Sequence, residues 1–212
     1  LNSGGWENDI INNPKILIPQ TGDKITAAID RNCYYHLNNI HSFAPHKKGL
    51  ELQYVCAILN SSLINWYYKR ISLEEDRALA QIDIETAEKL PIIVASKQYQ
   101  IQVSHIVDYL HFINSIESIN FDTLIINFFE QIIDGMVYEL YFPELLKKYD
   151  CEIIKHLGEL PEFTEGMSDE DKMEICQKVF DRLNDATHPV RINLDRMKEE
   201  IPEIRIIEGL DN

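Results

Sequence analysis

The spacing of apolar residues changes once along this chain, near Leu50, and this change limits the folds that the chain can adopt. Before Leu50, short apolar and aromatic runs alternate with turn residues, which is typical of β-strands. After it, apolar residues recur every three or four positions, which is typical of amphipathic helices. The sequence therefore predicts an α+β fold, in which a small, mostly antiparallel β-containing domain with helices precedes a helical domain.

The segment before Leu50 contains several runs with the composition of strands. The first is compact and apolar, and turn residues on both sides limit its length. Two later runs are rich in aromatic and β-branched residues, and Asn38-Asn39 between them is a plausible turn. The expected strands cover residues 15–19, 25–29, 33–37 and 39–43.

The helical part of the sequence has recognisable starts and stops. Asn60 and Ser61 are expected to end one helix and cap the next, and Ser168 is expected to cap a later one. Beyond Ser96 the pattern is almost wholly helical and ends in an acidic tail, so we place the domain boundary between residues 98 and 99. The expected helices cover residues 50–59, 63–70, 101–117, 121–142, 143–157, 168–186 and 190–201.

Charge is divided unequally between the two predicted domains. Residues 1–100 carry 10 basic and 11 acidic side chains, a net charge of −1, whereas residues 101–212 carry 10 and 24, a net charge of −14. Within the first part, residues 10–73 have a net charge of +4 and three histidines. Because a polyanion is bound by a local surface and not by the total charge, the acidic composition does not exclude nucleic acid as a partner of the first domain.

Motifs of catalysis are missing from the sequence. The eight glycines form no G-x-G turn for a nucleotide cofactor, and residues 12–15 lack the second proline and the aromatic of an Asn-Pro-Pro-aromatic motif. We therefore expect no catalysis, cofactor or metal within this chain. One alternative is a zinc enzyme that uses the string Cys33, His36, His41 and His46, although this spacing is not a usual closed zinc pattern.

The four cysteines are far apart and form no Cys-x-x-Cys pair, which favours reduced thiols in a cytoplasmic protein. The first residues lack the features of a signal peptide, and no run has the roughly 18 apolar residues of a membrane helix. Since the chain begins at Leu1 and not at Met, we expect it to be a piece of a longer protein.

Four motifs occur in a fixed order: P-K-I-L-I-P at 14–19, Tyr34-Tyr35, A-I-L-N-S-S-L-I-N-W-Y at 57–67 and K-L-P-I at 89–92. In this order they resemble the TaqI-like C-terminal specificity domain of type II restriction-modification enzymes. Members of that family are the target recognition domains of combined endonuclease/adenine-specific DNA methyltransferases and of related methyltransferases. The sequence V-Y-E-L-Y at 137–141 also resembles a signature in the helical tails of such enzymes.

The resemblance implies a division of labour within a longer polypeptide. An upstream methyltransferase domain would bind S-adenosylmethionine and carry the catalytic motif. A combined enzyme would also hold a metal-dependent nuclease domain further upstream, with Mg²⁺ as its candidate metal. Residues 1–98 would then be a DNA target-recognition domain, with double-stranded DNA and the upstream domains as its partners and no membrane partner. The adenine to be modified would be flipped out of the duplex into the upstream domain.

The candidate DNA-binding residues are chosen by type and by their place on predicted loops and strand ends. Arg and Lys read guanine or hold phosphates, and Asn reads adenine. The resemblance fixes none of them, because each member of the family reads a different site. The candidates are Lys24, Arg31, Asn32, Asn38, Asn39, His41, His46, Lys47, Lys48, Lys69, Arg70 and Arg77.

A rival hypothesis is a protein-interaction module in which the long helices dock a partner protein. Exposed apolar residues along 121–142 would favour it. Charge reversal at Lys47 and Lys48 distinguishes the two hypotheses, because it should abolish DNA binding and leave binding of a partner protein intact.

Overall fold

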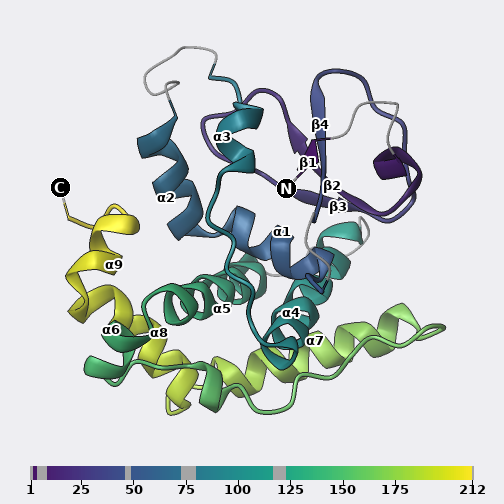
Figure 1. The fold of residues 1–212 in the computed structure, drawn as a ribbon. Helices are drawn as coiled ribbons and strands as arrows, with labels where there is room; N and C mark the ends of the chain where they lie inside the picture. The colour runs from purple at the N-terminus through teal and green to yellow at the C-terminus, as the bar shows by residue number, and fades with distance from the viewer. Residues whose placement is uncertain (1, 4–8, 46–48, 73–79, 117–122, 212) are drawn as a thin grey trace. The chain divides into compact units, whose positions relative to one another are not determined.

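The computed structural model describes residues 2–3, 9–45, 49–72, 80–116 and 123–211. The chain divides into two compact units, residues 1–100 and 101–212. Strands occur in the first unit, whereas the described part of the second unit is helical apart from its connecting segments (Figure 1). The α+β fold class is therefore confirmed.

The first unit is built on a small antiparallel sheet with the strand order β1-β4-β2-β3. The central strand β2 pairs through Ile16 with Ile29 on one side and with Phe43 on the other. Both Ile16 and Phe43 are fully buried, so the sheet contributes one face to the core. The strands are β1 (Asn2–Ser3), β2 (Lys15–Pro19), β3 (Ala28–Asp30) and β4 (Ile40–Ala44), and the 3-10 helix η1 (Asp9–Asn12) precedes β2.

The sheet confirms two of the expected strands and corrects the other two. Residues 15–19 and 40–44 are extended and paired, as the composition predicts. The strand expected at 25–29 begins only at Ala28. The strand expected at 33–37 is wrong, because this aromatic segment belongs to a loop, residues 31–39, that connects β3 to β4.

Among the described residues of the first unit, three helices precede α4 (Lys97–Ser115): α1 (Leu52–Asn60), α2 (Ser62–Ile71) and α3 (Ile84–Glu88). The break between α1 and α2 lies where the sequence predicts it, and the Ser61 hydroxyl accepts a hydrogen bond from the Ile64 amide. Asp83 caps α3, and its own amide donates to the Tyr68 hydroxyl at 2.9 Å. This bond ties the start of α3 to α2.

The second unit contains the greater part of α4 (Lys97–Ser115), together with α5 (Thr123–Tyr141), α6 (Pro143–Lys148), η2 (Ile154–His156), α7 (Asp169–Leu183), α8 (Pro189–Glu200) and α9 (Pro202–Ile207). Aromatic rings join these helices: Tyr109 contacts Phe129, and Phe128 contacts Phe180 edge-on. Gly135 allows α5 to approach its neighbours closely, since a Cβ there would lie 2.6 Å from a methyl group of Leu194.

Two predictions for the second unit are wrong at helix ends. The helix that starts at Pro143 stops at Lys148 and does not reach residue 157, because Asp150 adopts a left-handed φ of 50°. The Cys151 amide then bonds back to the Leu146 carbonyl, which satisfies the end of the helix. Beyond residue 201, where an acidic tail was expected, Pro202 starts the short helix α9.

None of the described helices combines the length and the apolar character needed to cross a lipid bilayer.

Candidate nucleic-acid interface

A buried ion pair lies where the loop at 31–39 leaves β3. The Lys15 ammonium lies 2.6 Å from the Asp30 carboxylate, and both side chains are almost fully removed from solvent. Lys15 also donates to the Ile11 carbonyl at 3.2 Å. Each charge therefore has a partner, which is what allows two ionised groups to remain inside the fold.

Asp30 also organises the first turn of this loop. Its two carboxylate oxygens accept hydrogen bonds from the amides of Asn32 and Tyr34, at 2.9 and 2.8 Å. Burial raises the pKa of Asp30, but these bonds and the Lys15 ammonium outweigh it and hold the pKa below its ordinary value of 3.8. The turn is tight enough that Cys33 adopts a left-handed φ of 56°.

The sheet topology makes this loop cross from one end of β2 to the other, so we call residues 31–39 the crossover loop. The loop leaves β3 at Asp30, which pairs with Lys15 at the start of β2. It enters β4 at Ile40, which pairs with Pro19 at the end of β2. In its middle the side chains of His36 and Ser42 are hydrogen-bonded. The crossover loop is thus fixed at its start and at its centre.

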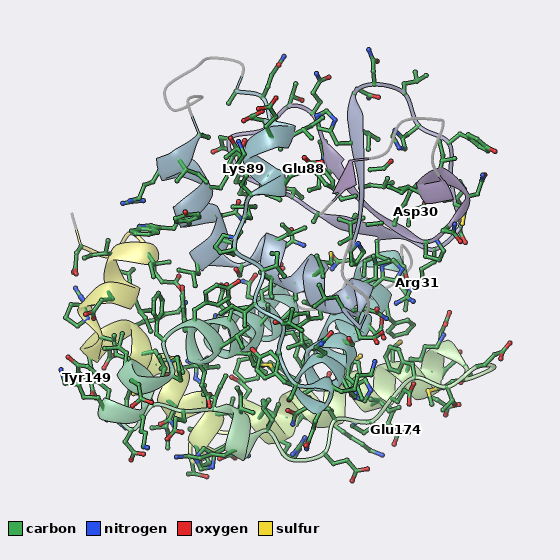
Figure 2. The ribbon with its side chains drawn as sticks, in the orientation of Figure 1. Asp30, Arg31, Glu88, Lys89, Tyr149 and Glu174 are labelled. Carbon is green, nitrogen blue, oxygen red and sulfur yellow. The ribbon has the colours of Figure 1, made fainter. Side chains whose placement is uncertain are left out.

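Four of the predicted DNA-binding residues lie on the crossover loop and are exposed: Arg31, Asn32, Asn38 and Asn39. Figure 2 shows Arg31 beside Asp30 at the end of β3. Asn32 donates from its side chain to the Tyr34 hydroxyl at 3.0 Å. The Asn39 carbonyl accepts from the Gln20 amide, so this end of the loop lies beside the end of β2. The structure therefore brings two pairs of predicted residues to the two ends of one loop.

His41 lies in β4 and not on a loop, and its side chain is half-buried. Its ring contacts Phe43 edge-on, with ring centroids 6.5 Å apart. Burial lowers the pKa of His41 from its ordinary value of 6.5, and the neighbouring His36 lowers it further. The lowered pKa favours the neutral imidazole of His41, which weakens this residue as a contact for phosphate.

Three of the predicted basic residues lie around the end of α2. Lys24 is exposed in the turn after β2, and Lys69 lies 3.7 Å from the adjacent Asp23. Arg70 stacks over the Trp66 ring at 3.8 Å and donates to the Trp66 carbonyl. The predicted residues thus form two groups within the described part of the first unit. The other four candidates, His46, Lys47, Lys48 and Arg77, lie outside the described residues.

The zinc alternative finds no support among the residues that the structure describes. They contain no group of three or more His, Cys, Asp or Glu side chains placed to hold a metal ion. Of the string that suggested zinc, His36 is bonded to Ser42, and His46 lies outside the described residues.

Comparison with known proteins relates the first unit to a known family. Residues 2–92 match the family described as the TaqI-like C-terminal specificity domain. The matched residues make up less than half of the chain. The match contains the whole of the described sheet, the crossover loop and helices α1 to α3. The resemblance deduced from the four sequence motifs is therefore confirmed.

A curated protein of Methanocaldococcus jannaschii is similar to this chain beyond the specificity domain. It is 30% identical over 136 residues, and its name provisionally describes a type II restriction enzyme and methyltransferase. The match covers 62% of this chain but only 11% of the relative. Because the matched stretch is longer than either unit, it includes sequence from both.

Two asparagines of the family motif hold the specificity domain together. Asn60 bonds to both the amide and the carbonyl of Ala27, each at 2.8 Å. Asn65 bonds in the same way to Ile25, accepting from its amide at 2.7 Å. The two side-chain amides make the hydrogen bonds that the backbone of a neighbouring strand would otherwise make. They therefore fix the position of residues 25–27, which precede β3. Sequence analysis assigned Asn60 to a helix stop and missed this role, because the bonds join residues 33 and 40 positions apart.

Replacing Asn65 by alanine is expected to lower the free energy of unfolding by about 1–3 kcal/mol. The Ile25 amide would lose its acceptor in a part of the domain where Ile25 is buried. Urea titration followed by circular dichroism measures the change. Replacing the exposed Asn114 of α4, whose side chain donates to the Leu110 carbonyl of its own helix, serves as a control. Equal stabilities of the two variants would refute the role of Asn65 in fixing residues 25–27.

The structure also adds residues that sequence analysis did not select. The sequence pattern predicts Tyr34, Tyr35 and Leu37 as strand residues, but they lie on the crossover loop and are 63%, 67% and 74% exposed. A strand alternates its side chains between two faces, so a strand at this position would have buried some of them. The sequence signal that points to exposure is the Asn-rich surroundings of this run.

Proposed function

We propose that residues 1–98 recognise a specific sequence of double-stranded DNA for a restriction-modification enzyme. The match to the specificity-domain family carries this proposal. The crossover loop supports it, because it exposes one arginine and three asparagines, the side chains that bind guanine and adenine edges in the major groove.

The distribution of charge supports DNA contacts by the first unit. At a net charge of −14, residues 101–212 repel phosphates, whereas residues 10–73 have a net charge of +4. The exposed Lys24 and Lys69 supply cations for backbone contacts, which position a protein on DNA without reading its sequence. The second unit then serves to brace the recognition domain or to set its distance from the target base.

The chemistry of the parent enzyme follows from the same proposal. A methyltransferase domain that uses S-adenosylmethionine would modify an adenine of the recognised site, and the present chain would be non-catalytic. The name of the archaeal relative, which joins restriction and methyltransferase activities, supports this arrangement. The partners of the chain are then the DNA duplex and the catalytic domains of the same polypeptide.

The rival hypothesis of a helical docking module gains no support from α5. Its apolar residues pack inside the second unit, with Phe129 against Tyr109 and Phe128 against Phe180. Among the large apolar side chains of α5, only Leu124 is more than half exposed. This helix therefore lacks the continuous apolar stripe that binds a partner.

DNA binding is tested by selecting duplexes from a random library with the 212-residue chain and titrating the selected site at several salt concentrations. We expect the charge-reversed variant Lys24→Glu/Lys69→Glu to reduce the slope of log K against log salt by about 2, because two phosphate contacts are lost. Lys178→Glu, on the exposed face of α7, is the control and should leave the slope unchanged. Failure to bind any duplex at low salt would refute the proposed function.

A further inference from the structure

The apolar side chains at the centre of the crossover loop need an explanation. Tyr34, Tyr35 and Leu37 occupy three of four consecutive positions, and each is more than three-fifths exposed. The Tyr35 hydroxyl lies 3.4 Å from the Asn12 side chain and the Tyr34 hydroxyl accepts from Asn32, yet both rings remain exposed. Grouped exposed apolar side chains are typical of a binding surface, whereas isolated ones are ordinary.

From this group we infer that Tyr34, Tyr35 and Leu37 form a wedge that inserts between base pairs of the recognised duplex. The inference rests on the proposed function and adds a mode of recognition to it. Apolar side chains inserted at a base step unstack the bases and kink the duplex. Because base steps differ in how easily they deform, such an insertion also contributes to sequence specificity. An opened stack also lowers the cost of extruding a neighbouring base.

The backbone beneath the wedge is held before DNA arrives. Asp30 accepts from two loop amides, and His36 is bonded to Ser42. Because these contacts already order the loop, less conformational entropy is lost when DNA binds. A loop without such contacts would fold back or move away when its apolar side chains met a tightly stacked duplex.

Charge around the wedge favours a polyanion over other partners. No acidic residue occurs between Arg31 and Ala44. The carboxylate of Asp30, at the start of the loop, is buried and neutralised by Lys15. Arg31 and Asn32 on one side and Asn38 and Asn39 on the other offer donors to phosphates and base edges. An apolar tip between such donors fits a DNA groove.

The wedge is tested in the 212-residue chain with the selected duplex, labelled with 2-aminopurine at successive positions of the site. Binding of the unmodified protein should raise 2-aminopurine fluorescence at one base step, which reports unstacking. Replacing Tyr34, Tyr35 and Leu37 together by alanine should remove this rise and reduce the ratio of specific to non-specific affinity by 10- to 100-fold. Tyr34→Phe/Tyr35→Phe keeps both rings and should retain the signal.

The control variant is Tyr67→Ala, which removes an exposed tyrosine of α2 in the same unit. It should leave both the fluorescence rise and the affinity ratio unchanged. If the unmodified chain selects no duplex, the proposed function itself fails. If it selects a duplex and the triple variant binds that duplex with unchanged specificity and fluorescence, only the wedge is refuted. An unchanged melting temperature of the triple variant confirms that the loss is not one of folding.

Discussion

Replacing Lys15 by methionine is expected to lower the free energy of unfolding by about 3–5 kcal/mol, measured by urea titration at pH 7. The loss does not come from the lysine stem, since methionine has a similar shape. It comes from Asp30, whose carboxylate would stay buried without the cation that lies 2.6 Å from it. The two loop amides that bond to Asp30 offset only part of this cost.

The same variant is expected to change how stability depends on pH. In the unmodified protein the pKa of Asp30 is below 3.8, so its contribution is complete above that value and is lost as the pH falls through the folded-state pKa. Without Lys15, burial dominates and raises this pKa, so the folded variant binds a proton at higher pH. The difference in stability between the two proteins should therefore become smaller as the pH falls from 7 to 4.

A matched control distinguishes the effect of breaking the buried ion pair from the effect of removing any lysine charge. Lys69→Met removes a lysine that lies 3.7 Å from Asp23 on the surface, where the two side chains are 47% and 80% exposed. Exposed pairs contribute about 0–1 kcal/mol, so this variant should be nearly as stable as the unmodified protein. If Lys15→Met and Lys69→Met proved equally stable, the ion pair would not be what fixes the start of the crossover loop.

Periodicity alone predicts most of the regular elements of this chain. The strand at 15–19 and the amphipathic helices bury residues that recur with the strand and helix spacings. The boundary at Ser61 could be predicted because a serine cap is a local device, whose acceptor and donor are three residues apart. Where structure depends on near neighbours, the sequence carries enough information to place it.

The crossover loop could not be predicted, because long-range contacts override its local preference. Its aromatic residues favour a strand, but the Asp30 carboxylate bends the backbone and is itself held by Lys15, fifteen positions earlier. Nothing local distinguishes Lys15 from a solvated lysine at the start of a strand. The same limit applies to Asn60 and Asn65, whose amides bind a segment more than thirty positions away.

The placement of the candidate DNA-binding residues in the fold could be predicted only in part, for a related reason. Arg31, Asn32, Asn38 and Asn39 were chosen for residue type and for loop location, and they do lie exposed on one loop. The same rule selects His41, but this residue lies in a strand, where burial lowers its pKa. Residue type predicts what a side chain is able to bind, whereas exposure and charge state depend on the fold around it.

Replacing Leu59 by alanine is expected to lower the free energy of unfolding by about 2–5 kcal/mol, because Leu59 is fully buried in α1 and its removal leaves a cavity. Leu37→Ala deletes the same atoms from the crossover loop, where the side chain is 74% exposed, and should change stability by less than about 0.5 kcal/mol. Urea titration compares the two variants, and equal losses would contradict the assignment of Leu59 to the core.

In DNA binding the order of the two effects should reverse. Leu37→Ala, although stable, should weaken discrimination between DNA sites. Leu59→Ala should keep it at temperatures where the variant is folded, since the core only supports the loop that reads the duplex.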